Sequence, residues 1–493
     1  MIRRLFFLLM TAAACACGKA PDTGIPSGQT PAIAPDYTDV TLPYNIAPLR
    51  FRVMEQGDRF RAVFRAGSES IACRSRSGDI RTPRRAWKKL LEGHRNEDLL
   101  IEISVKQNGR WETRPAIRNH IAGDPVDTYL TYRLLEPGYV NYGNMIIQER
   151  NLENFRTRTL VSNRRELAAG TDCCINCHTP RNRDGAFALF QVRGPLGGAV
   201  LSTPDGATRL NMKTDSTFAA TVYPAWHPTL PRIVFSINNI GQLFHTADVQ
   251  KIEVFDSRSD LVIYDMDTKT LSAVCRTDDA METFPVWSPD GQFLYYCSAA
   301  MPAADSTGEV SVIRDYRHIH YDLMRRPYDA ATGTFGEAEI MVRASSSELS
   351  VTFPRISPDG RFLLFCLSEY GTFSIWHRNT DLYLIDFETH ALRPLEKVNS
   401  RETESYHTWS SNGRWIVFSS RRDDGNFTRP YIAYMDRDGH ESKPFVLPQR
   451  RPDFYDRLLK SFNIPEFMIS PSLRTWRQYD DIIHAPATQI TYQ

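Results

Sequence analysis

A short pattern recurs four times in the second half of the chain and constrains the fold more than any other feature. In residues 284–291 it reads Phe-Pro-Val-Trp-Ser-Pro-Asp-Gly, and an apolar run follows. Because Pro-Asp-Gly specifies a tight turn, each unit predicts a strand, a turn and a second, buried strand. The units begin at Tyr223, Phe284, Phe353 and Tyr406; the fourth has Asn412-Gly413 in place of Pro-Asp-Gly, and the first lacks either turn. Their spacing, roughly 50 to 70 residues, predicts propeller blades with loop insertions.

This unit resembles the TolB-type, WD-like propeller repeat of bacterial periplasmic proteins. The resemblance covers residues 223–447, and Ser-Thr-Pro-Asp-Gly at 202–206 suggests a degenerate further blade. It implies a mainly β fold with a propeller of about five or six blades. Turn formation and core packing explain the repeated residues fully, so we predict that Trp287 and its equivalents are structural and carry no function of their own.

The first half of the chain predicts a separate β-rich domain. Residues 99–105 alternate between apolar and polar side chains, and Asn108-Gly109 then separates them from a second run, which is a strong hairpin signal. We expect a β-sandwich-like domain there. The expected organisation is a signal peptide (1–16), a flexible tether (17–45), the sandwich-like domain (46–170), a cysteine-containing segment (171–182), the propeller (183–448) and a C-terminal extension (449–493) with a helix near 454–462.

The N-terminus has the layout of a secretory signal. Two arginines precede the apolar run 5–10, and small residues then lead to Cys15 and Cys17. This stretch resembles a bacterial lipobox, which implies lipidation of Cys17 or, as the second choice, Cys15. An ordinary signal peptide with incidental cysteines is the alternative. We therefore expect a lipid-anchored envelope protein that faces the periplasm or lies in the outer membrane.

One motif carries chemistry of its own, Cys174-Ile175-Asn176-Cys177-His178. C-x-x-C-H is the attachment signature of c-type haem, in which two thiols bond to the haem vinyl groups and the adjacent histidine ligates the iron. The motif predicts haem attachment at Cys174 and Cys177 with His178 as the proximal ligand. Two alternatives stay open: a disulfide between two of Cys173, Cys174 and Cys177, or a small zinc site that includes His178.

Two downstream residues are candidates for the opposite iron ligand, Met212 and His227. His227 departs from the repeat, because the equivalent positions hold Ser288, Ser357 and Ser410. Such a departure indicates either function or a histidine that makes the same turn hydrogen bond as the serines.

Charge and missing motifs narrow the function. The chain has 59 Lys and Arg against 58 Asp and Glu, a net charge of +1, which argues against nucleic acid as a partner. No hydrolase, kinase or metalloprotease motif occurs, so we predict no catalytic residues and leave enzymatic activity open. Two hypotheses remain: a haem c lipoprotein for electron transfer or redox sensing, and a scaffold without a cofactor that binds protein or glycan partners on its propeller face.

Overall fold

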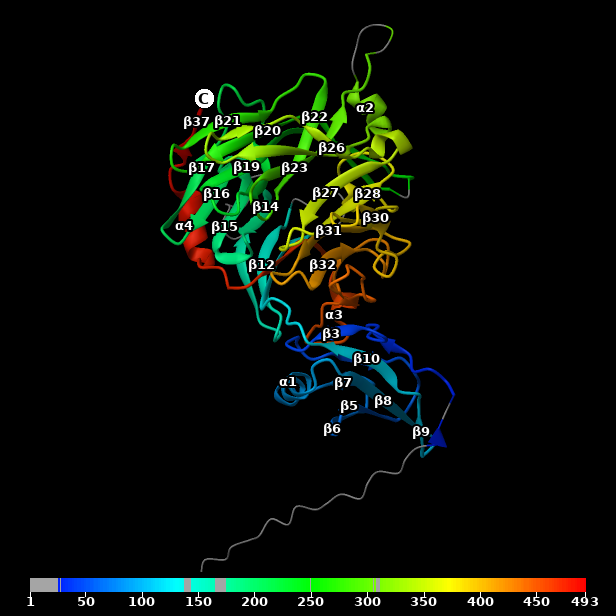
Figure 1. The fold of residues 1–493 in the computed structure, drawn as a ribbon. Coiled ribbons are helices and arrows are strands. Elements are labelled where there is room, and N and C mark those ends of the chain that lie inside the picture. Colours follow the sequence, from blue (N-terminus) through cyan, green and yellow to red (C-terminus); the bar gives the residue numbers. More distant parts are fainter. Residues whose placement is uncertain are drawn as a thin grey trace, which may run out of the picture.

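The protein forms two β-rich bodies, a small N-terminal domain and a propeller (Figure 1). The computed structural model describes residues 25–26, 28–136, 143–164, 174–248, 250–304, 306 and 311–493. The predicted signal peptide, the candidate lipidation sites Cys15 and Cys17, and Cys173 lie outside these residues. No helix in the described part of the chain is long and apolar enough to cross a membrane. The prediction of a mainly β protein with a propeller is confirmed.

The N-terminal domain contains two sheets and one helix. The strands of the seven-stranded sheet are β1 (Ile25–Pro26), β3 (Thr41–Pro43), β5 (Arg59–Ala66), β6 (Glu69–Ser75), β8 (Asp98–Gln107), β9 (Arg110–Thr113) and β10 (Ile117–Ala122). The three-stranded sheet contains β2 (Ile33–Ala34), β4 (Arg50–Val53) and β7 (Asp79–Arg81). Helix α1 (Arg84–Gly93) buries Trp87, whose Nε1 donates a hydrogen bond to the Ile46 carbonyl at 3.0 Å. The predicted hairpin is present as β8 and β9, with Asn108 and Gly109 at φ 49° and 81°.

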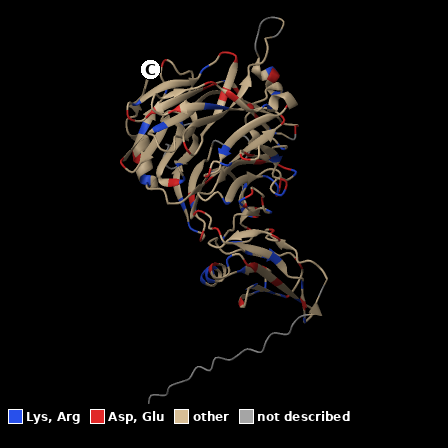
Figure 2. Ribbon diagram, in the orientation of Figure 1, with Lys and Arg blue, Asp and Glu red and all other residues tan. Residues whose placement is uncertain are grey.

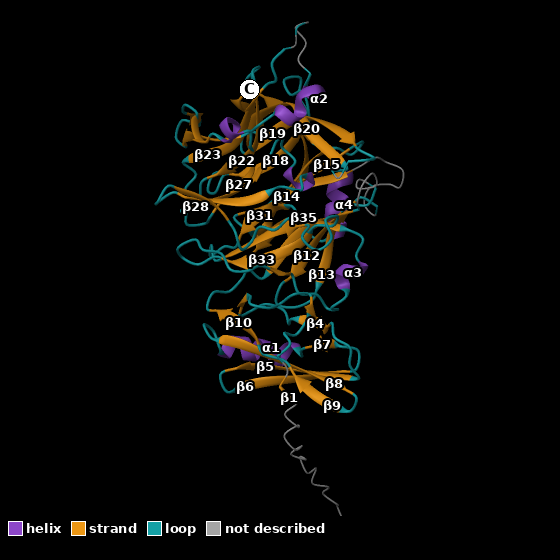
Figure 3. Cartoon of the chain, turned by 90° about the vertical axis from the view of Figure 1, so that its right-hand side faces the viewer, coloured by secondary structure: helices purple, strands orange, loops and turns teal. Residues whose placement is uncertain are grey.

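The described residues of the propeller form six blades, and Figure 3 shows the propeller above the N-terminal domain. The blades, each given from the channel outward, are as follows. Blade 1 contains β35 (Ser461–Met468), β11 (Tyr129–Leu135), β12 (Ile146–Asn151) and β13 (Thr157–Ser162). Blade 2 contains β14 (Cys174–Arg181), β15 (Asp184–Arg193), β16 (Gly198–Thr203) and β17 (Gly206–Asn211). Blade 3 contains β18 (Thr221–Trp226), β19 (Arg232–Phe244), β20 (Ile252–Asp265) and β21 (Thr270–Cys275).

The remaining blades follow the repeats in the sequence. Blade 4 contains β22 (Ala280–Trp287), β23 (Phe293–Ala300), β24 (Asp322–Asp329), β25 (Thr334–Phe335) and β26 (Glu339–Val342). Blade 5 contains β27 (Ser350–Ile356), β28 (Phe362–Ser368), β29 (Asp381–Asp386) and β30 (Ala391–Pro394). Blade 6 contains β31 (Glu404–Trp409), β32 (Trp415–Ser420), β33 (Arg429–Tyr434) and β34 (Phe445–Val446). The short helices α2 (Val312–Asp315), α3 (Phe454–Arg457) and α4 (Trp476–His484) lie outside the sheets.

Several expected boundaries differ from the structure. Residues 28–45, expected to be a tether, include β2 and β3 of the N-terminal sheets. The sandwich-like domain does not extend to residue 170, because β11 to β13 belong to blade 1. Residues 171–182 are no separate segment, because Cys174–Arg181 is the inner strand of blade 2.

The C-terminal residues 449–493 are part of the propeller and not an extension. Strand β35 pairs antiparallel with β11, while β36 (Thr488–Gln489) and β37 (Thr491–Tyr492) add parallel edges to blades 2 and 3. The helix expected near 454–462 is limited to α3, and β35 begins at Ser461. Local sequence patterns cannot reveal such a closure, because the partner strands lie more than 300 residues apart.

The tryptophans of the repeat link neighbouring blades. Trp287 is 5% exposed, and its Nε1 donates a hydrogen bond to the Ala225 carbonyl of blade 3 at 3.2 Å. Trp226 and Trp409 make the same kind of bond to the preceding blade, at 3.4 and 3.2 Å. The Pro-Asp-Gly turn after Trp287 places Gly291 at φ 73°, where a side chain would be strained. The repeat is therefore structural, as its composition indicates.

We expect Trp287→Ala to lower the free energy of unfolding by about 3 to 5 kcal/mol, because it removes a buried aromatic ring and leaves the Ala225 carbonyl without its donor. Chemical denaturation followed by circular dichroism measures the change. Leu459→Ala, at a side chain that is 69% exposed, is the control and should change stability by less than about 0.5 kcal/mol. An equal effect of both substitutions would contradict the role of Trp287.

Candidate functional site

A ring of six residues encloses the axis of the propeller, one from the inner strand of each blade. They all have positive φ, between 43° and 52°: Cys177, Tyr223, Phe284, Phe353, Tyr406 and Ile464. The register of the inner strand shifts at this point in every blade, as a β-bulge requires. Non-glycine residues rarely adopt positive φ, so its repetition in all six blades shows that the fold imposes it.

Aromatic side chains fill most of this ring. Ring centroids lie 4.5 Å apart for Tyr223 and Phe284, 4.1 Å for Phe284 and Phe353, and 4.2 Å for Phe353 and Tyr406. Cys177 and Ile464 complete the circle and, with the aromatics, line a cavity of only about 40 Å³. The ring therefore closes the channel in its middle and leaves a mouth on either side.

The bulge places Cys177 and His178, the last two residues of the C-x-x-C-H motif, in different environments. Cys177 lies on the channel axis, whereas His178 lies between blades 1 and 2 and lines a cavity there with Leu160 and Tyr479. Cys174 is half-buried near the start of β14, and its Sγ accepts a hydrogen bond from Asn176 Nδ2 at 3.0 Å. Burial raises the pKa of the Cys174 thiol, which favours its protonated form.

His178 is a buried, neutral imidazole. Burial, and the nearby Arg133 as a second cause, lower its pKa from 6.5 to about 3, whereas the backbone groups of Thr131 and Ile464 act in the opposite direction. At the same place in the other blades the chain has Pro224, Pro285, Pro354 and Pro465, and His407 in blade 6. Burial also lowers the pKa of His407 to about 3. The surroundings of the His178 imidazole decide whether iron could reach one of its nitrogens.

The arrangement does not fit a c-type haem. The cavities that Cys177 and His178 line have volumes of about 90, 40 and 30 Å³, whereas a pocket for a drug-sized ligand measures about 300 to 1,000 Å³. β14 is also hydrogen-bonded along its length to β15. A macrocycle bonded to both thiols and ligated by His178 would have to separate blade 1 from blade 2.

The two alternatives for the motif are not supported by the described residues either. Cys174 and Cys177 are free thiols. Within the described part of the chain, the single group of three metal-ligating side chains with donor atoms within 4.8 Å of one another is Asp436, Asp438 and His440. That group is mostly exposed, and Asp436 Oδ1 accepts hydrogen bonds from the backbone of the other two, as in an ordinary turn.

The candidate distal ligands do not approach His178. Met212 is buried within blades 2 and 3, where its Sδ accepts a hydrogen bond from Thr221 Oγ1 at 3.3 Å. His227 Nδ1 accepts hydrogen bonds from the backbone N–H groups of Thr229 and Leu230 at 3.2 and 3.0 Å. Neither residue lines a cavity that Cys177 or His178 lines. His227 thus accepts turn hydrogen bonds, as the Ser288 hydroxyl does from Phe293.

The larger opening lies on the side of the ring where the Pro-Asp-Gly turns gather. We call it the mouth cavity. It has a volume of about 390 Å³, within the range of ligand pockets. Its lining includes Trp226, Trp287 and pyrrolidine rings from four blades, among them Pro224 and Pro285. No motif in the sequence marks the mouth cavity, because its lining consists of residues that the repeat already explains.

Few charges enter the mouth cavity, and these are held in place. Arg355 Nη2 lies 3.8 Å from Glu466 Oε1, and burial raises the pKa of the Glu466 carboxyl. Arg183 Nε donates a hydrogen bond to the Trp409 carbonyl at 2.7 Å. The cavity therefore presents proline and indole rings together with polar groups that are held in place by the protein.

Comparisons with known proteins give distant likenesses alone. No protein-family model and no curated protein matches the chain. Similar solved structures include an oligogalacturonate lyase in complex with manganese (16% identity, TM-score 0.38, 65% of this chain and 73% of the lyase). A puromycin-hydrolysing peptidase of Mycobacterium tuberculosis shares 11% identity (TM-score 0.37, 65% and 54%). An ACO/RPE65 chimera shares 12% identity (TM-score 0.38, 90% and 97%).

The low pKa of His178 predicts an acid-sensitive fold. Below pH 6.5 the unfolded chain binds a proton at this residue and the folded chain does not, so stability falls as pH falls from 6.5 towards 3. We expect this residue to contribute a slope of about 1.4 kcal/mol per pH unit. Urea unfolding at pH 6, 5 and 4 should show a weaker dependence of the free energy of unfolding on pH for His178→Pro than for the wild type. Proline is chosen because the equivalent strands of other blades have it at this position.

The equivalent change His407→Pro should reduce the slope by a similar amount, because His407 has the same burial and the same low pKa. Identical slopes for the wild type and both variants would contradict the buried, neutral state of these histidines.

Proposed function

We propose that the chain is an envelope lipoprotein whose TolB-like propeller binds a protein partner in the mouth cavity, and that it works without covalent haem. The observation that carries the proposal is the cavity itself, about 390 Å³ above a closed ring, with a lining that combines proline and indole rings with polar side chains. A closed ring excludes passage through the channel, so a ligand can enter the mouth but not cross the propeller. Binding is the function that this geometry supports best.

The lining favours a protein segment over a glycan. Pyrrolidine rings and the edges of two buried indoles offer apolar contacts, and several polar groups of the lining are already engaged within the protein: Arg355 with Glu466, Arg183 with the Trp409 carbonyl and Asn182 with the Pro228 carbonyl. A glycan needs several free hydrogen-bonding groups at its hydroxyls, whereas an inserted loop gains mainly from apolar burial. The glycan remains the second outcome of the binding test.

Site-specific photo-crosslinking in intact cells tests the binding site. A benzophenone side chain at Thr229, which is exposed and lines the mouth cavity, should give one discrete crosslinked protein band. The same group at Asp267, exposed in the turn after β20, is the matched control and should give none. Equal bands at both positions, or none at Thr229 while polysaccharide protects the cavity, would contradict a protein partner.

The mature protein should carry a lipid and no haem. Mass spectrometry after expression with a working haem-attachment system should find a lipid-modified N-terminus at Cys17 and no haem mass on Cys174 or Cys177. Membrane retention should be lost when Cys15 and Cys17 are both replaced by serine. A haem-sized increment on β14 would restore the electron-transfer hypothesis, and a mature N-terminus far from residue 17 would overturn the anchor.

A further inference from the structure

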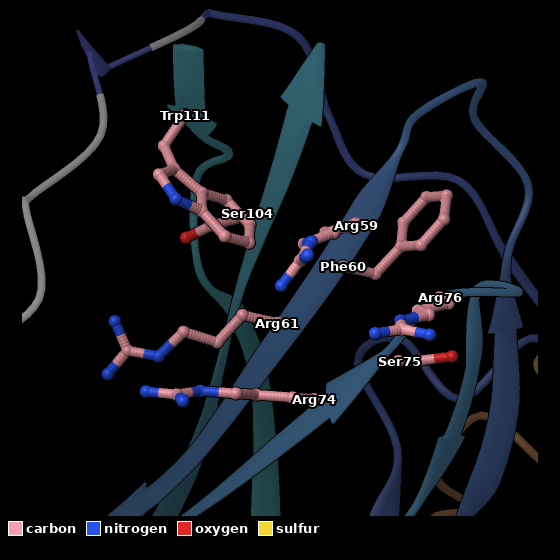
Figure 4. Close-up of a pocket in the computed structure, with 8 residues that line it drawn as sticks. All are labelled: Arg59, Phe60, Arg61, Arg74, Ser75, Arg76, Ser104 and Trp111. Carbon is pink, nitrogen blue, oxygen red and sulfur yellow. The ribbon is translucent and has the colours of Figure 1, made fainter. Parts of the chain in front are cut away.

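The N-terminal domain carries a groove whose charge nothing in the described protein balances. The groove lies on the face of the large sheet that points away from the domain core, and it has a volume of about 450 Å³. Figure 4 shows its lining residues. Four of its eight lining residues are arginines and none is acidic: Arg59, Arg61, Arg74 and Arg76, together with Phe60, Ser75, Ser104 and Trp111. We call it the arginine groove.

Strand register forces these positive charges together. Arg61 on β5 lies directly opposite Arg74 on β6, and Arg59 lies opposite Lys106 on β8. Like charges directly opposite each other on one sheet face destabilise the pairing. Figure 4 shows Arg61 and Arg74 running side by side with their guanidinium groups on the same side. Repulsion between these positive charges lowers the stability of the domain when no ligand is bound, and a bound anion would reduce that repulsion.

The arginines also lack partners within the described protein. None of the four makes an ion pair or a side-chain hydrogen bond there, and Arg61 Nε is buried without an acceptor. Arg65, on the same strand, shows the contrast, because its Nε lies 3.5 Å from Glu102. Figure 2 shows that acidic residues are present elsewhere on this domain, so the groove is not part of a uniformly basic surface. Guanidinium groups bind phosphate oxygens through paired hydrogen bonds.

We propose that the arginine groove binds the phosphate groups of anionic lipid headgroups at the membrane surface. The location favours a membrane over a soluble anion. Strand β1 pairs with β9 beside Trp111, and Ile25 of β1 is 62% exposed. Ile25 lies eight positions after Cys17 in the sequence, which is a reach of roughly 29 Å at most. This step rests on the proposed lipid anchor, which would hold the groove close to the bilayer.

The exposed aromatic and aliphatic residues at the groove fit the same occupant. Trp111 is partly exposed, and tryptophan is enriched where proteins meet the headgroup region of a bilayer. Basic residues near an anionic surface each strengthen binding, and salt weakens the attraction. The groove thus combines phosphate-binding side chains with apolar side chains at its edge.

Vesicle sedimentation tests the proposal without the anchor. The full chain with Cys15→Ser and Cys17→Ser should bind vesicles of phosphatidylglycerol in phosphatidylcholine, and should bind pure phosphatidylcholine far more weakly. Arg61→Gln with Arg74→Gln should weaken binding about 25-fold, at about fivefold per arginine. Arg65→Gln is the matched control and should leave binding unchanged, because that arginine is already paired.

A further variant distinguishes loss of binding from loss of folding, and two soluble anions test whether the membrane is the occupant. Arg74→Glu places opposite charges across β5 and β6, so it should keep or raise the melting temperature and still weaken vesicle binding. Equal binding to both vesicle types, or undiminished binding by the double variant, would overturn the proposal. Inorganic phosphate or heparin that binds the groove as tightly as the vesicles do would overturn the membrane as its occupant. If the native protein is shown to carry no lipid while the double-serine chain still binds the vesicles, only the anchor is overturned and the groove proposal stands.

Discussion

The pairing of β35 with β11 is the contact on which the propeller depends. It joins Ser461–Met468 to Tyr129–Leu135 in an antiparallel ladder, so the first blade is built from both ends of the chain. Closing the circle removes the unpaired sheet faces that an open array of blades would expose. Strands β36 and β37 extend this effect, because they cover the outer edges of blades 2 and 3. The contribution of the last 45 residues is therefore structural.

Closure arranges six inner strands around one axis, and the bulges in these strands determine which side chains lie at the centre of the propeller. Each bulge directs one side chain to the axis, and proline is the commonest residue at the next position. The C-x-x-C-H motif occupies this position in blade 2. Cys177 takes the place of an aromatic ring residue, and His178 takes the place of a proline. The same spacing that is typical of haem attachment is here divided between two sides of a strand.

How far the sequence could predict the fold depended on whether each blade carried its own signal. Blades 4, 5 and 6 contain the turn signature, and the prediction located them directly. Blades 1 and 2 lack the full unit, since Phe467 and Pro180 stand where Trp287 stands in blade 4, so the strands of blade 1 and the inner strand of blade 2 were assigned to other parts of the chain. The site was harder to predict, because neither the mouth cavity nor the arginine groove has a motif. Both depend on strand register, which brings together residues that are distant in sequence or individually ordinary in type.

The mouth cavity and the arginine groove differ in whether their charges are paired, and this difference suits them to different partners. The mouth cavity combines apolar rings with polar groups, and its charges are paired or hydrogen-bonded within the protein, so contact there would be little affected by salt. The arginine groove is exposed and unpaired, so contact there would be electrostatic and sensitive to salt. Direct contacts such as the hydrogen bonds from Ser411 to Asp127 join the two bodies. A membrane held at one surface would therefore leave the other available for a partner.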